Sequence, residues 1–222
     1  MTLCKPKYVT FDCYGTLIHF RMADAARQLY ADRIAEGRMT AFTLDFTAYR
    51  LDEVMKDWKP YREVIVESLR RACKRWAIEY RDTDGSTVYE TVPTWGPHPD
   101  VPAGLAKVAK EFPLVALSNA ANEQIHANVA QLGAPFYRAF TAEQAGSYKP
   151  HMRPFEYMLD ELGCGPDDVL HVSSRVRYGL MPARDMGIRN KVWVRPGTEP
   201  EAPGYEYVEI RDINGLPALL GL

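Results

Sequence analysis

Residues 7–16, KYVTFDCYGT, decide the fold class that the rest of the chain must fit. The apolar run KYVTF at 7–11 is typical of a short buried strand, and Gly15 predicts a tight turn soon after it. Asp12 stands at the carboxyl end of that strand. Open parallel sheets bind their ligands at this edge, so the stretch predicts a strand that presents Asp12 to a functional site.

Strands and helices alternate in the second half of the chain. Strand-like apolar runs lie at 114–118, 168–173 and 191–195. Helical runs lie near 101–111, 121–132, 153–162 and 181–186. This alternation predicts an α/β fold, a doubly wound, Rossmann-like parallel sheet with helices on both faces. The pattern assigns neither helix nor strand to the short segment FYRAFTAE at 136–143.

A helical insert interrupts this pattern near the N-terminus. From 20 to 82 apolar residues recur at spacings of three and four, which is typical of amphipathic helices. Prolines and a glycine then crowd into residues 91–102, which predicts a return linker. We therefore expect a core domain formed by residues 1–18 and 96–222, with a helical cap domain at 19–95.

Composition narrows the class of partner. A net charge of -2 provides no general basic field, so we expect a small-molecule partner and no nucleic acid. The sequence contains no signal peptide pattern and no apolar run near the roughly 18 residues that span a bilayer, which predicts a cytoplasmic protein without membrane contact. Four cysteines (Cys4, Cys13, Cys73 and Cys164) lack a CxxC pair, which favours reduced thiols over a disulfide frame or zinc site.

Side chains capable of chemistry follow the predicted strands. They are Asp12 after the first strand, Ser118 and Asn119 at the second, Ser173 and Ser174 at the third, and Lys149 in the SYKP loop between the last two. Because the carboxyl ends of parallel strands meet at one edge of a sheet, we expect these side chains to converge.

Four segments, taken together, resemble the motifs of the haloacid dehalogenase superfamily and its 2-haloacid dehalogenase branch. They are FDCYGTL at 11–17, ALSNA at 116–120, SYKP at 147–150 and DVLHVSSRVRYGLMPARDMG at 168–187. The resemblance covers the whole chain and implies the core-and-cap architecture of that superfamily. It also implies a hydrolase with a covalent ester intermediate.

The roles of the site residues follow from the resemblance and from their chemistry. Asp12 is the expected nucleophile, and Lys149 is the cation that holds it ionised. Thr16, Ser118 and Asn119 are expected to orient the carboxylate or the substrate. The expected substrate contacts are Cys13, Tyr14, Phe42, Ser173, Ser174 and Arg175.

Tyr14 decides between two reaction types. Phosphatases of the superfamily carry a second aspartate at this position, which protonates the leaving alkoxide and adjoins the magnesium site. Tyr14 is poorly suited to protonate a leaving group in place of that aspartate, whereas a halide needs no proton to leave. The sequence therefore predicts displacement at carbon without a metal or a cofactor.

Two positions depart from the dehalogenase pattern. The aspartate that is thought to position the hydrolytic water falls on Gly179 or, with a gap, on Tyr178, and Arg175 stands where an asparagine is expected. The arginine that grips the substrate carboxylate falls near Phe42. Other cations that could replace it are Arg21, Arg38, Arg175 and Arg177. Among the histidines, His151 is a candidate for water activation and His171 is expected in the core.

The leading interpretation is a dehalogenase-like hydrolase that acts at the carbon alpha to a carboxylate of a small acid. Opening of a strained carbon–nitrogen ring, as in azetidine-2-carboxylate, is the first alternative, and it would need a proton donor for the departing amine. A non-catalytic protein that binds small carboxylates is the second alternative. A homodimer is also compatible with the sequence.

Overall fold

The computed structural model describes residues 5–195 and 199–222. The chain divides into two compact units, one made of the segment that ends at His19 together with Gly96–Leu222, the other of Phe20–Trp95. This division starts the second unit one residue later than the cap domain predicted at 19–95. Cys4, which the sequence analysis named, lies outside the described residues.

The first unit is built on a parallel sheet. Within the described part of the chain it has six strands in the order β3-β2-β1-β4-β5-β6, and every neighbouring pair runs parallel. The strands are β1 (Tyr8–Phe11), β2 (Leu114–Ser118), β3 (Phe136–Thr141), β4 (Val169–Ser173), β5 (Asn190–Val194) and β6 (Val208–Ile210). Val9 of β1 pairs with Leu114 on one side and Leu170 on the other. The strand order therefore reverses at β1, and the carboxyl end of β1 lies at a topological switch point.

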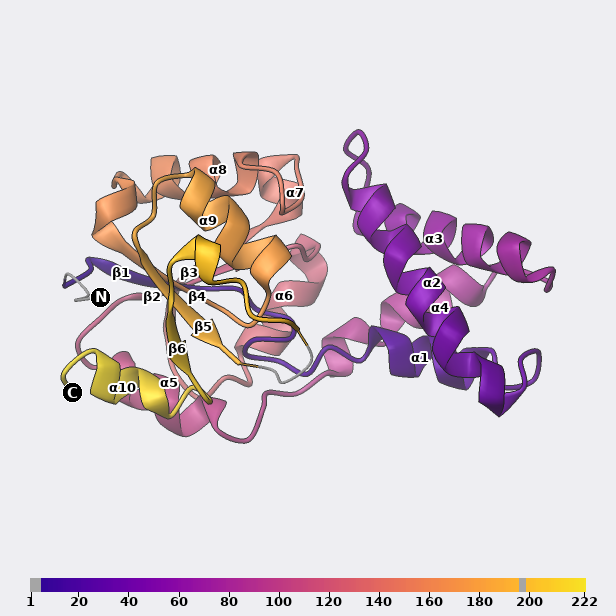
Figure 1. The fold of residues 1–222 in the computed structure, drawn as a ribbon, viewed down its shortest axis with the longest axis horizontal. Coiled ribbons are helices and arrows are strands. Elements are labelled where there is room, and N and C mark those ends of the chain that lie inside the picture. The colour runs from indigo at the N-terminus through magenta and orange to yellow at the C-terminus, as the bar shows by residue number, and fades with distance from the viewer. Residues whose placement is uncertain (1–4, 196–198) are drawn as a thin grey trace. The chain divides into compact units, whose positions relative to one another are not determined.

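Helices cover both faces of this sheet. Figure 1 shows α7, α8 and α9 on one face and α5 and α10 on the other. The helical segments of the unit are α5 (Val101–Val108), α6 (Asn122–Val129), α7 (Ala142–Ala145), α8 (Arg153–Leu162), η2 (Pro166–Asp168), the π-helix η3 (Val176–Leu180), α9 (Met181–Asp185), η4 (Pro203–Tyr205) and α10 (Gly215–Leu219). Phe155 and Met158 of α8 pack with Val115 and Leu117 of β2 in a fully buried cluster. Such two-sided cover explains why every residue of β2, β4 and β5 is buried.

The structure confirms the predicted α/β fold and extends it. The four predicted strands are present, but β3 and β6 were missed. Strand β3 is an edge strand whose Tyr137 is exposed, and β6 has only three residues. Neither strand therefore carries the continuous apolar run that marks the buried strands.

The second unit is helical, as predicted. Its elements are α1 (Met22–Leu29), α2 (Glu36–Val54), α3 (Tyr61–Trp76), α4 (Asp84–Glu90) and η1 (Val92–Thr94). Helix α4 begins beyond residue 82, where the helical pattern was expected to end. No helix of residues 5–195 and 199–222 is long and apolar enough to cross a membrane.

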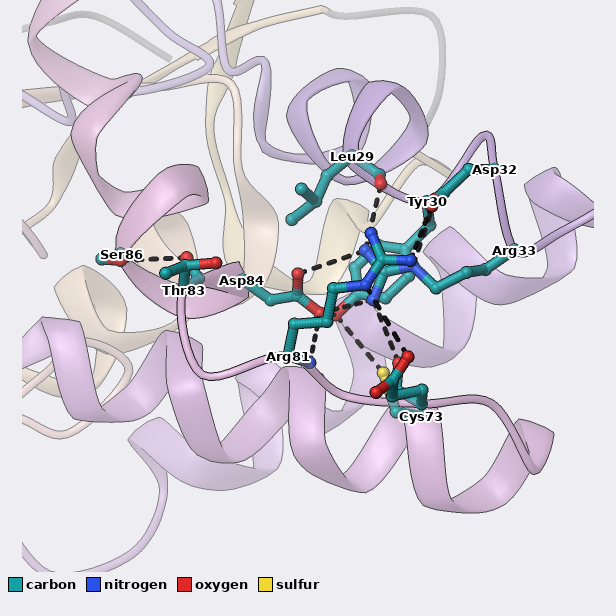
Figure 2. A network of polar contacts seen from close by, with 10 residues as sticks. Leu29, Tyr30, Asp32, Arg33, Cys73, Arg81, Thr83, Asp84 and Ser86 are labelled. Carbon is teal, nitrogen blue, oxygen red and sulfur yellow. Dashed lines mark hydrogen bonds and ion pairs between the residues drawn. The ribbon is translucent and has the colours of Figure 1, made fainter.

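A buried ion pair joins three parts of the helical unit (Figure 2). Arg33 donates from Nη1 and Nη2 to the two carboxylate oxygens of Asp84, at 2.7 and 3.1 Å. The Tyr30 hydroxyl and the Arg81 amide donate to the same carboxylate, at 2.8 and 3.0 Å. Burial alone would raise the pKa of Asp84, but these hydrogen bonds outweigh burial and lower it.

We expect Asp84→Asn to lower the free energy of unfolding by about 3 kcal/mol or more, because it leaves the buried Arg33 guanidinium without its counter-charge. Urea unfolding followed by circular dichroism measures this loss. The control is Glu90→Gln, since Glu90 pairs with Arg62 at 3.8 Å on the surface and its loss should cost less than about 1 kcal/mol. Equal effects of the two substitutions would show that the Asp84 ion pair stabilises the fold no more than a surface ion pair does.

Candidate active site

The backbone fixes Asp12 at the carboxyl end of the central strand. Its amide donates to the Val172 carbonyl of β4 at 3.0 Å, which continues the ladder one residue beyond β1. The chain then turns sharply: the Leu17 amide donates to the Cys13 carbonyl at 2.8 Å, and Gly15 has a φ of 93°. A left-handed backbone of this kind favours glycine, so the local sequence determines the turn that follows Asp12.

Lys149 forms a buried ion pair with Asp12. The Lys149 ammonium donates to Asp12 Oδ1 at 2.7 Å and to the Leu117 carbonyl at 2.5 Å, and the lysine side chain is 1% exposed. The ammonium therefore links the ends of two adjacent strands, β1 and β2. The contact places a positive charge directly against the Asp12 carboxylate.

Asn119 holds the loop that carries this lysine. Its side-chain oxygen accepts from the Lys149 amide at 2.7 Å, and its Nδ2 donates to the Lys149 carbonyl at 2.8 Å. Both backbone groups of Lys149 are thereby bonded to one amide side chain. Asn119 acts on Asp12 through Lys149, so it is a positioning residue.

Thr16 binds the second carboxylate oxygen of Asp12. Its hydroxyl donates to Asp12 Oδ2 at 2.8 Å and accepts from the Ser174 amide at 2.8 Å. The Ser174 hydroxyl in turn donates to the Gly15 carbonyl at 2.7 Å. Each carboxylate oxygen thus receives one hydrogen bond, and the loop after β4 holds the turn after β1.

Ser118 is the only one of these predicted side chains without a bond in the described part of the chain. It ends β2, next to the carbonyl that Lys149 binds, and its hydroxyl is buried without a hydrogen-bond partner. Buried polar groups are normally satisfied, and an exception calls for an explanation. The hydroxyl oxygen is fully enclosed by the protein, so its donor is not exposed to a ligand in this structure.

Arg175 reaches the turn after Asp12. A side chain at Gly15 would place its Cβ 2.8 Å from Arg175 Nε, so the guanidinium lies directly against that glycine. Arg175 Nη1 donates to Glu199 Oε1 at 3.1 Å, and the Val176 amide donates to Glu199 Oε2 at 3.0 Å. Glu199 was not predicted, because it lies 24 positions from Arg175 in a loop that carries no recognisable motif.

Three predicted substrate contacts have other partners. Cys13 is fully buried, and burial raises the pKa of its thiol far above the ordinary value. The Tyr14 hydroxyl donates to Asn128 Oδ1 at 2.7 Å. Phe42 lies in the helical unit and is fully buried, and its ring contacts Tyr30 and Trp76 at 4.8 and 5.7 Å between centroids. Cys13 and Phe42 are therefore buried within their units, and their contact with a substrate stays a prediction.

The loop after β4 has no space for an acid at Gly179. A Cβ there would lie 2.2 Å from the Ser173 hydroxyl oxygen and 2.4 Å from Ser173 Cβ. The hydroxyl of Ser173 is itself engaged, since it accepts from the Arg175 amide at 2.9 Å. Among residues 5–195 and 199–222 no group of three or more His, Cys, Asp or Glu side chains is arranged to hold a metal ion.

His171 lies in the core, as predicted. It is fully buried on β4, its Nδ1 lies 2.9 Å from the Thr10 hydroxyl, and its ring contacts Phe155 at 5.0 Å. Burial lowers the pKa of its imidazole well below 6.5, and the charges of Lys149 and Lys191 lower it further. The imidazole is therefore neutral in the folded protein at neutral pH.

We expect Gly179→Asp to lower the free energy of unfolding by about 1–3 kcal/mol, because its side chain overlaps Ser173, and to leave hydrolytic activity no higher. Thermal and urea unfolding measure the change. Gly37→Ala is the matched control, since nothing lies within 4 Å of a Cβ at that helical position and the change should be neutral or slightly stabilising. A stable, more active Gly179→Asp variant would contradict the packing of this loop.

We also expect His171 to make the folded state less stable in acid. Because its folded pKa lies below 6.5, the unfolded chain binds a proton there that the folded chain excludes, so the free energy of unfolding falls as the pH drops below 6.5. One such group contributes a slope of up to about 1.4 kcal/mol per pH unit. His171→Gln should remove that slope in urea titrations between neutral and mildly acidic pH, whereas substitution of the exposed His126 by Gln should retain it.

Comparisons with known proteins agree with this architecture. A family model described as haloacid dehalogenase-like hydrolase matches residues 6–187. The chain is 25% identical to (S)-2-haloacid dehalogenase 4A of Burkholderia cepacia over 94% of this chain and 91% of that protein. It is 24% identical to haloacetate dehalogenase H-2 of Moraxella sp. (strain B), over 77% and 78% of the two chains.

The fold has counterparts among solved structures. The L-2-haloacid dehalogenase of Xanthobacter autotrophicus, solved with chloropropionic acid covalently bound, superposes with a TM-score of 0.79 at 20% identity and covers 97% of this chain and 98% of its own. That likeness concerns the fold. Because the family model matches most of the sequence, this chain belongs to the haloacid dehalogenase-like hydrolase family.

Proposed function

We propose that this hydrolase displaces a leaving group from the carbon alpha to the carboxylate of a small acid, as a 2-haloacid dehalogenase does. One observation carries the proposal: the Asp12 carboxylate is buried, ionically paired with Lys149 at 2.7 Å and bonded to Thr16 at 2.8 Å. Relatives that are 25% and 24% identical are named for 2-haloacid and haloacetate dehalogenation, which supports this substrate class.

In the first step an oxygen of Asp12 attacks the alpha carbon of the substrate. A carbon–oxygen bond forms while the carbon–halogen bond breaks, and the halide leaves with the bonding electron pair. Lys149 and Thr16 hold the two carboxylate oxygens, which limits rotation of the nucleophile.

In the second step water attacks the carbonyl carbon of the aspartyl ester. The ester bond to the substrate breaks, a 2-hydroxy acid leaves, a proton is released and the Asp12 carboxylate returns. The Lys149 ammonium and the Thr16 hydroxyl are placed to stabilise negative charge that develops on the ester oxygens. Gly179 offers no acid to position this water, so we propose that ester hydrolysis limits turnover.

Product release tests the proposal. We expect the wild type to release chloride from 2-chloropropionate without added metal, measured by ion chromatography, and Asp12→Asn to lose at least about a thousand-fold of that rate. Azetidine-2-carboxylate, with amino-acid analysis of the opened product, is the second substrate. Ring opening without halide release would replace the proposed leaving group by an amine, and silence on both substrates would favour a non-catalytic binding protein.

Intact-protein mass spectrometry tests the ester. We expect a propionate-sized adduct on the wild type soon after mixing with 2-chloropropionate, since the step that removes it is slow. Asp12→Asn should show no adduct at that time. Fast chloride release with no adduct at any time would indicate direct attack by water.

A further inference from the structure

The two segments that flank the helical insert pair with each other inside the sheet unit. The chain leaves this unit after His19 and returns to it at Gly96. The His19 amide donates to the Gly96 carbonyl at 3.0 Å, and the His98 amide donates to the Leu17 carbonyl at 3.0 Å. The outgoing and returning segments are therefore fixed to each other.

Two imidazole rings stack across this pair of segments. The ring centroids of His19 and His98 lie 4.0 Å apart, with 55° between the ring planes. The His98 ring is also hydrogen-bonded to the Gly15 backbone. The guanidinium of Arg175, which pairs with Glu199, lies against the same glycine. His98 is therefore packed against the turn that joins β1 to the outgoing segment.

This turn also carries a group that binds the Asp12 carboxylate. The Thr16 hydroxyl donates to Asp12 Oδ2 at 2.8 Å. The Gly15 amide donates to the Ile18 carbonyl at 2.7 Å, so the turn and the outgoing segment form one hydrogen-bonded piece. A displacement of His98 from Gly15 would therefore disturb the hydroxyl that holds the carboxylate.

The surroundings of His98 are unfavourable for a second ring proton. Its Nε2 is enclosed by the protein and has no hydrogen-bond partner among the described residues. Burial lowers the pKa of His98 below its ordinary value, and the charges of His19 and Arg175 lower it further. Asp100 and the hydrogen bond to the Gly15 backbone raise it by less. The ring is therefore neutral at neutral pH, and a proton bound in acid creates a buried imidazolium without an acceptor.

We propose that His98 is a positioning residue for the turn after Asp12, and that a proton taken up from solvent at its Nε2 releases the turn. The neutral ring stacks on His19 and holds Gly15, and Thr16 is thereby kept on the carboxylate. The charged ring leaves its stack for water, and the Thr16–Asp12 contact loosens. The effect on the rate rests on the proposed function, whereas the effect on the turn does not.

Amide hydrogen exchange of the full-length protein tests the release of the turn without any substrate. We expect peptides that cover residues 13–20 and 95–101 to exchange at least about ten-fold faster at mildly acidic pH than at neutral pH, after correction for the intrinsic rates. His98→Phe keeps a ring that stacks on His19 and binds no proton, so its exchange should not change with pH. The matched control is His126→Gln, since His126 is exposed on α6 and its loss should leave the wild-type response.

His19→Phe provides a second prediction, which remains available if His98→Phe fails to fold. Because the charge of His19 lowers the pKa of His98, its removal should move the midpoint of the exchange transition to higher pH. A midpoint that stays in place or moves to lower pH overturns the proposal.

Three other exchange results would overturn the proposal. They are wild-type exchange that does not change with pH, equal acceleration in His98→Phe, and equal acceleration of a peptide that covers β4. The last result would mean that acid lowers the stability of the whole unit.

Chloride release from 2-chloropropionate gives the functional readout. The kcat of the wild type should fall over the pH range in which exchange accelerates, while the kcat of His98→Phe stays level. An equal fall in both proteins overturns the positioning role. A turn that responds to pH in a wild type that releases no chloride would retain the release of the turn by His98 and refute the proposed reaction.

Discussion

The buried ion pair between Lys149 and Asp12 is the interaction on which the site depends. Two charges removed from water are favourable only when their geometry is good and their remaining hydrogen-bonding groups are satisfied. The structure meets both conditions. Asp12 is held by the β4 ladder and Thr16, while Lys149 is held by the Leu117 carbonyl and by Asn119 on its backbone. The parallel sheet therefore brings four chain segments together at one edge, where this ion pair forms.

The loop after β4 carries a cation, and it is closely packed at Gly179. Arg175 brings a positive charge to this loop, and Glu199 from another segment pairs with it. The space that an acid at Gly179 would need is filled by Ser173.

The buried charged side chains of the helical unit have different kinds of partner. Asp84 is surrounded by donors and Glu53 by three cations, so each contributes to joining helices. Arg50 is held by aromatic rings and has no such partner among the described residues.

The sequence by itself determined the α/β class, four of the strands, the helical character of the insert and the convergence of Asp12, Thr16 and Lys149. These follow from local patterns, because apolar runs, turn residues and strand ends are encoded within a few neighbouring positions. Only the tertiary structure decided that Phe42 packs inside the helical unit, that Glu199 pairs with Arg175, and that Arg50 stacks on the ring of Phe20. Each of these contacts joins residues that are well separated in the chain. A local sequence pattern does not predict such a contact.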